Sequence, residues 1–172
     1  MGFIYNDKEY INIVNDILED SEFRKIDGLV HHGLSRLDHS LKVSYFSYKV
    51  AKLLRLDVRK TARAGLLHDF FLSDNENMKD KITSLFAHSS KAVKNADERF
   101  ILSDKEKDII ISHMFPIASP KPPKYMEGWV VSTVDKVVGT YEFAYTYSHG
   151  FKLKFRNASV LIALFVSQFI HV

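Results

Sequence analysis

An imidazole and a carboxylate stand side by side at His68-Asp69, directly after the small and apolar residues 61–67. Imidazole nitrogens and carboxylate oxygens are ligands that zinc and other divalent transition metals accept in proteins. Because chance can supply one such dipeptide, the pair gains meaning only from further residues of the same chemistry. The further candidates are His39 upstream and His88, His113 and Asp135 downstream.

These six side chains offer enough nitrogen and oxygen for two metal ions that share one carboxylate. Ligands of a buried metal point inward, so each should share a helix face with apolar residues. His39 meets this condition with Val43 and Val50, and Asp135 meets it with Val131. A carboxylate on an apolar stripe is costly unless it is paired or bound to metal.

His113 also meets the condition, because Ile109 and Ile110 lie one turn before it. His88 is the weakest member, since its short segment also allows a helix cap or a surface residue. Any one of these histidines could instead be a hydrogen-bonded core residue, and the convergence of all six favours a metal site.

The residues around the His-Asp pair suit a helix that a neighbour approaches closely. His68 and Asp69 would point about 100° apart on a helix, so they can straddle one ion or reach two. Ala64 and Gly65 lie one turn earlier, and their small size allows close approach. The glycine lowers intrinsic helix stability by about 1 kcal/mol.

Helical spacing of apolar residues runs through the chain, and no segment alternates with the period of a strand, so we expect an all-α fold. Helices are predicted over residues 7–20, 41–54, from the N-cap Asp57 to 69, from a capping box at Ser103 and Glu106 to 113, and over 126–147. Residues 71–80 and the proline-rich residues 116–124 are expected loops.

We expect one domain over residues 1–172, with a metal-binding core at about 30–145 and a C-terminal packing helix at about 157–171. The apolar run 160–166 in that last helix is too short to span a bilayer. An interfacial or dimer-forming helix is the alternative, and homo-oligomerisation stays open.

The amino-acid composition limits which kinds of functional site the chain can form. The absence of cysteine excludes disulfides, thiolate metal sites and cysteine nucleophiles. The formal charge of +3 permits anionic substrates, but no dense stripe of lysine and arginine indicates a nucleic-acid surface. With no signal peptide and no membrane span in the sequence, we expect a cytoplasmic protein.

The ordered set of His39, His68-Asp69 and Asp135 resembles the signature of the HD-domain superfamily of metal-dependent phosphohydrolases. His88 and His113 resemble the additional ligands of its binuclear members. The likeness covers roughly residues 30–145 and is especially close to small bacterial HD-domain proteins around Asp38-His39-Ser40.

The resemblance implies an all-helical HD fold with one or two divalent ions, among them iron, manganese, nickel, cobalt or zinc. The first ion would be held by His39, His68, Asp69 and Asp135. Asp69 would bridge to a second ion held by His88 and His113. The chain departs from the cyclic-dinucleotide phosphodiesterases of the family, because it lacks their Lys after the pair and their Gly-Tyr-Pro motif.

The leading hypothesis is hydrolysis of a small phosphorylated substrate by a metal-activated water, with His68 and Asp69 as the catalytic pair. Arg36, Lys136, His31, His32 and Lys124 are candidate substrate contacts, although each could equally be a solvated or loop residue. Two alternatives remain, a di-iron oxygenase on the same fold and a non-catalytic module in which a metal only staples helices.

Overall fold

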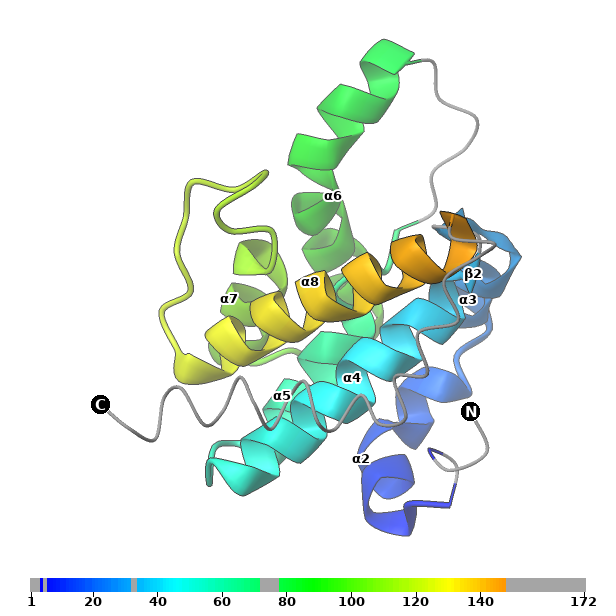
Figure 1. The fold of residues 1–172 in the computed structure, drawn as a ribbon. Helices are drawn as coiled ribbons and strands as arrows, with labels where there is room; N and C mark the ends of the chain where they lie inside the picture. Colours follow the sequence, from blue (N-terminus) through cyan, green and yellow to red (C-terminus); the bar gives the residue numbers. More distant parts are fainter. Residues whose placement is uncertain (1–3, 5, 32–33, 72–77, 148–172) are drawn as a thin grey trace.

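The structure is a computed structural model that describes residues 4, 6–31, 34–71 and 78–147. Its elements run in the order α2 (Lys8–Leu18), α3 (Ser21–Arg24), a 3-10 helix η1 (Lys25–Gly28), β1 (Val30–His31), β2 (Leu34–Ser35), α4 (Arg36–Leu53), α5 (Val58–Leu67), α6 (Met78–Arg99), α7 (Asp104–Ser112) and α8 (Met126–Tyr147) (Figure 1). The expected all-α fold is confirmed, and the two short strands form one antiparallel pair in which Val30 faces Ser35.

Side-chain caps fix where the helices begin. The Asp57 carboxylate accepts from the backbone N–H of Lys60 at 3.1 Å, and Ser103 and Glu106 form the reciprocal capping box, both as predicted. Helix α4 begins five residues earlier than predicted, because the Ser35 hydroxyl accepts from the backbone N–H of Asp38 at 3.1 Å. His39 therefore lies in the first turns of α4.

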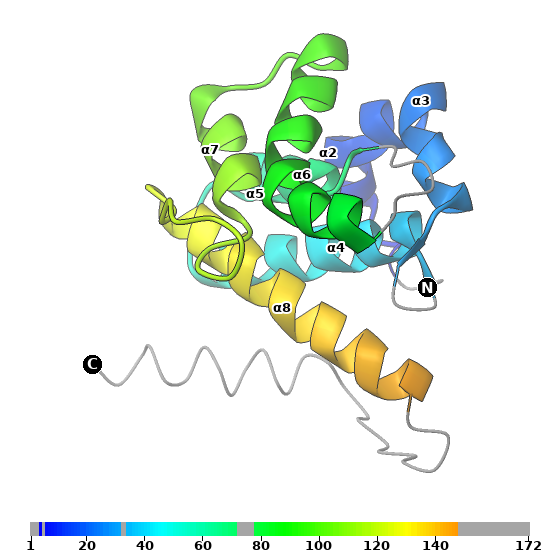
Figure 2. The same ribbon diagram turned by 90° about the horizontal axis from the view of Figure 1, so that it is seen from above.

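Helix α5 occupies the middle of the fold and contacts α2, α4, α6, α7 and α8. Helices α4 and α8 lie side by side and run in opposite directions (Figure 1). Seen from above, α7 lies on one side of the molecule and α2 and α3 on the other, with α5 and α6 between them (Figure 2). Five other helices of the described chain therefore pack against α5.

The predicted close approach occurs between α5 and α4. A Cβ atom placed on Gly65 would lie 3.1 Å from the Cα atom of Ser44, a distance shorter than most Cβ contacts in proteins. The Ser44 hydroxyl donates to the carbonyl of Ala62 at 2.6 Å and accepts from the Tyr10 hydroxyl at 2.8 Å. This buried chain of hydrogen bonds ties α2, α4 and α5 together.

Helix α6 is the main departure from the sequence-based prediction. The loop expected over residues 71–80 gives way to helix at Met78, and His88 lies inside a 22-residue helix. Its described inward face carries His88, Ala92 and Ala96, which are small or polar side chains. Residues 72–77 and the predicted C-terminal helix at 157–171 lie outside the described residues.

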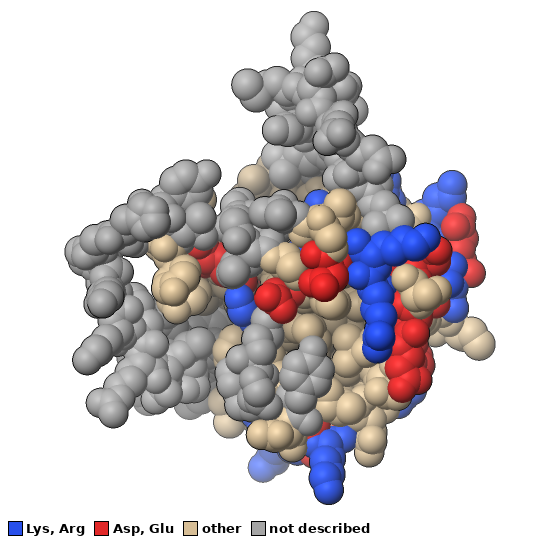
Figure 3. Space-filling view, turned by 90° about the vertical axis from the view of Figure 1, so that its right-hand side faces the viewer, with Lys and Arg blue, Asp and Glu red and all other residues tan. Residues whose placement is uncertain are grey.

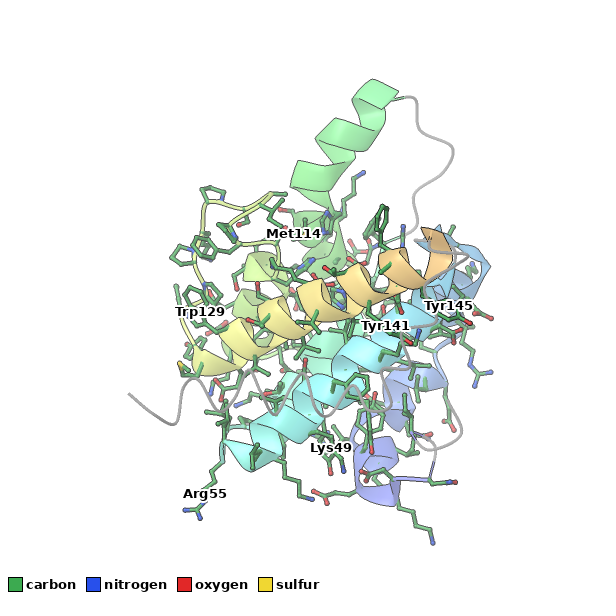
Figure 4. The ribbon with its side chains drawn as sticks, in the orientation of Figure 1. Lys49, Arg55, Met114, Trp129, Tyr141 and Tyr145 are labelled. Atoms are coloured by element: carbon green, nitrogen blue, oxygen red, sulfur yellow. The ribbon has the colours of Figure 1, made fainter. Side chains whose placement is uncertain are left out.

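Several large aromatic side chains of α8 face solvent. Trp129, the one tryptophan of the sequence, is 42% exposed near the start of α8, and Tyr141 and Tyr145 are exposed towards its end (Figure 4). Within the described part of the chain, no helix is long and apolar enough to cross a membrane.

Replacing Gly65 and Gly139 by alanine should change stability in opposite directions. In Gly65→Ala the new methyl meets the backbone of Ser44, so we expect a loss of about 1–3 kcal/mol. Gly139, also helical, has no described heavy atom within 4 Å of its Cβ position. Gly139→Ala should therefore gain about 0.5–1 kcal/mol from helix propensity.

Urea unfolding of the metal-free variants, followed by Trp129 fluorescence, measures both changes. A gain in stability for Gly65→Ala like that expected for Gly139→Ala would contradict the close packing of α4 against α5.

Candidate metal centre

The six predicted ligands converge at the centre of the fold from α4, α6, α7, α8 and the end of α5. Their ligand atoms form three overlapping groups, each within 4.8 Å: His39, His68 and Asp69; His68, His113 and Asp135; Asp69, His88 and His113. Asp135 is partly buried and the other five are buried. Because Asp69 belongs to the first and the last of these groups, the arrangement suits two ions that share its carboxylate.

His68 is aimed into the cluster by the end of its own helix. Its Nδ1–H donates to the carbonyl of Gly65 at 2.8 Å, so Nε2 faces the interior. That atom lies 3.5 Å from Asp135 Oδ1 and 3.7 Å from Asp69 Oδ2. It is buried and has no hydrogen-bond partner among the described residues. A buried nitrogen left in this state is costly, and a metal ion would satisfy it.

His113 repeats this arrangement at the end of α7. Its Nδ1–H donates to the carbonyl of Ile110 at 2.7 Å, and its Nε2 lies 3.0 Å from Nε2 of His88. The two Nε2 atoms are 3.8 and 3.7 Å from Asp69 Oδ1. Three groups that can ligate thus face one another, as a second ion would require.

His39 is held by carboxylates at both ring nitrogens. Its Nε2 lies 3.1 Å from Asp135 Oδ1, and its Nδ1 lies 2.7 Å from Glu142 Oε2. Glu142 is fully buried and also binds Lys42 Nζ at 2.7 Å. We did not predict Glu142, although its place seven residues after Asp135 on the same helix was a usable signal.

Burial and neighbouring charges together shift the pKa values of these groups. Burial alone would lower the pKa of His39, but its bonds to Asp135 and Glu142 outweigh burial and raise the pKa to about 10. Burial and the neighbouring His68 lower the pKa of His113 to about 4. Burial would raise the pKa of Asp69, but the surrounding histidines hold it well below its usual range. Asp69 therefore stays ionised at neutral pH, and His39 would release a proton when it binds a metal ion.

Two of the three lysine and arginine side chains predicted as substrate contacts, Arg36 and Lys136, bind groups of the protein itself. Arg36 is buried, and its Nη1 donates to the carbonyl of Phe71 at 2.5 Å. Its guanidinium group lies over the Phe71 ring, 4.0 Å from the ring centre. The Phe71 ring in turn lies 5.4 Å from the ring of His88. Arg36 thus fixes Phe71 beside a candidate ligand.

Lys136 donates from Nζ to the His113 carbonyl at 2.9 Å and to the carbonyl and hydroxyl of Ser132. Lys124 is exposed and precedes α8, which begins at Met126. The helical rise from Met126 to Asp135 is about 14 Å, so Lys124 lies well away from the candidate ligands. His31 lies in β1, and His32 falls outside the described residues. The geometry brings all six candidate ligands together and leaves these substrate contacts as expectations.

Comparison with known proteins agrees with this geometry. The family model described as "HD domain" matches residues 36–139, a segment that includes all six candidate ligands. The chain belongs to the HD domain family. This places the HD domain described here in a superfamily of metal-dependent phosphohydrolases, whose members bind divalent metals.

A curated relative of this HD domain is Ribonuclease Y of Mycoplasma genitalium, which is 29% identical over 110 residues. The match covers 62% of this chain and 21% of the relative, so the chain spans about a fifth of that protein's length. No solved structure matched the chain. Glu142 lies beyond the segment that the family model matches.

Single substitutions should distinguish the binding sites of the two proposed ions. Asp69→Asn removes the shared carboxylate charge and should lower the content of both ions, whereas His88→Ala should lower the content of one. Elemental analysis after dialysis against Mn²⁺ measures the bound metal per chain. Asp97→Asn, at an exposed carboxylate of α6 paired with Lys107, is the control and should change nothing. Equal loss in the Asp69 and His88 variants would contradict a shared carboxylate.

Proposed function

We propose that this protein hydrolyses a small phosphate ester with one or two divalent ions held by the six converging residues. The observation that carries the proposal is the position of Asp69, whose two oxygens face Nε2 of His68 on one side and Nε2 of His88 and His113 on the other. Such a shared carboxylate suits a pair of ions at the spacing that phosphoryl transfer uses.

When bound, the ions supply Lewis acidity, which lowers the pKa of a coordinated water and offsets negative charge on phosphoryl oxygens. The protein's own contribution is orientation. The carbonyls of Gly65 and Ile110 hold His68 and His113 with Nε2 inward. The Phe71 ring, fixed by Arg36, packs against His88 and excludes water from that side of the cluster.

Charge supports a small substrate over a polynucleotide. The formal charge of the chain is only +3. On the face shown in Figure 3, the described basic and acidic side chains lie beside one another and form no continuous basic surface. A protein that neutralises several phosphates of a nucleic acid needs such a surface. The similarity to Ribonuclease Y nevertheless makes RNA the natural competing substrate to test.

Turnover of phosphate esters should require metal and Asp69. After removal of metal by a chelator, the protein should be inactive, and Mn²⁺, Ni²⁺, Co²⁺, Fe²⁺ or Zn²⁺ should restore release of phosphate or nitrophenol. The assay panel holds a nitrophenyl phosphate monoester, the matching diester, nucleoside monophosphates and a short single-stranded RNA. Asp69→Ala should fall to the rate of the metal-free protein, and Asp97→Asn should keep the native rate.

Circular dichroism of Asp69→Ala checks that the variant remains folded. Activity on RNA alone would overturn the small-substrate proposal. Oxygen consumption by the iron-loaded protein, with no phosphate released from any ester by any metal form, would favour the oxygenase alternative. Metal binding without any turnover would favour a module in which the ions only join helices.

A further inference from the structure

We propose that Glu142, supported by Lys42, is a positioning residue that sets how strongly His39 binds its metal ion. The inference rests on the proposed metal centre and adds a residue outside the six expected ligands. Its starting point is that one helix, α8, places carboxylates at both nitrogens of the same imidazole ring.

The spacing along α8 explains how this is achieved. Asp135 and Glu142 are seven residues apart, which is about two helical turns, so both side chains lie on the face that packs against α4. Asp135 reaches Nε2 of His39 and Glu142 reaches Nδ1. The His39 ring is buried between them, with 1% of its surface exposed.

This contact determines which nitrogen of His39 is available to a metal. A carboxylate oxygen only accepts hydrogen bonds, so Glu142 Oε2 at 2.7 Å keeps the ring proton on Nδ1. Asp135 Oδ1, 3.1 Å from Nε2, is also an acceptor, so Nε2 carries a proton as well in the metal-free protein. A metal ion at the centre of the cluster would displace the Nε2 proton, and the Nδ1 proton would stay with Glu142. Glu142 thereby fixes both the tautomer and the orientation of the ligand.

The acceptor on His39 differs in charge from those on the other oriented histidines. His68 and His113 donate from Nδ1 to the neutral carbonyls of Gly65 and Ile110. An anionic acceptor draws the Nδ1 proton more strongly than a carbonyl does, which increases electron density at Nε2. His39 should therefore be a stronger metal ligand than the same ring bound to a neutral acceptor.

Lys42 holds Glu142 in place for this role. Its Nζ lies 2.7 Å from the second carboxylate oxygen, Oε1, so both oxygens of the buried Glu142 have a partner. Lys42 follows His39 by three residues on α4, which places both groups on the side that faces α8. The side chain of Lys42 is 22% exposed, so the chain of contacts runs from the metal ligand to the surface.

The simpler account is that Glu142 and Lys42 form a buried ion pair that only joins α4 to α8. Under that account, loss of the Glu142 charge lowers stability and leaves the affinity for metal unchanged. Under our proposal, the affinity of the ion at His39 falls even when the folded protein is measured. Metal affinity and stability must therefore be measured separately.

The test variant is Glu142→Gln, which keeps the shape and an accepting oxygen but removes the charge. Full-length protein freed of metal is titrated with Co²⁺ in competition with a chelator, and binding is followed by visible absorption. We expect the ion at His39 to bind roughly 10- to 100-fold more weakly, with its absorption band shifted. The ion held by His88 and His113 should keep its native affinity.

Glu106→Gln is the matched control, because Glu106 is also buried and pairs with Arg63 at 3.4 Å near the start of α7. It should lower the urea midpoint and leave both Co²⁺ affinities unchanged. Native Co²⁺ affinity in folded Glu142→Gln would overturn the proposal, as would an equal loss of affinity in both variants.

A second measurement needs no substitution. Nuclear magnetic resonance of the Zn²⁺-loaded protein, with ¹⁵N-labelled histidine, should show His39 with its proton on Nδ1 and that proton further downfield than those of His68 and His113. Coordination of His39 through Nδ1 would overturn the proposal. Neither measurement uses turnover, so failure of the hydrolase proposal is recognised separately.

Discussion

Asp69 and Asp135 carry charge into the interior of a helical fold, where an unpaired carboxylate costs several kcal/mol. The histidines that surround them come from helices remote in sequence, so those helices must meet at one point. Two of these histidines also end their helices. The hydrogen bonds from His68 to Gly65 and from His113 to Ile110 use carbonyls that a helix end leaves unpaired. The same bonds terminate a helix and orient a ligand.

Local rules predicted much of this arrangement. The N-caps Asp57 and Ser103 and the bounds of α8 could be predicted, because capping and apolar periodicity depend on neighbouring residues. The inward positions of His39 and His113 followed from the same periodicity. Helix α6 was not predicted, and its described buried side chains, His88, Ala92 and Ala96, include no large apolar residue that would mark an inward face.

Contacts between distant elements could not be predicted in this way. The role of Glu142 depends on α8 lying along α4, which no local pattern encodes. The donors of Arg36 and Lys136 contact backbone carbonyls of Phe71 and His113, and a sequence does not show which carbonyls a fold brings near. The convergence of the six candidate ligands was thus predictable from residue type and order. The residues that orient these candidates could be found only in the packed structure.

The two contacts to His39 require that Asp135 and Glu142 stay seven residues apart. An inserted or deleted residue between them would rotate one carboxylate by about 100° relative to the other, so α8 could no longer hold both nitrogens of His39. Side chains within this interval that face solvent, such as the exposed Tyr141, are less constrained. Along this stretch of α8, the number of residues matters more than the identity of those that face solvent.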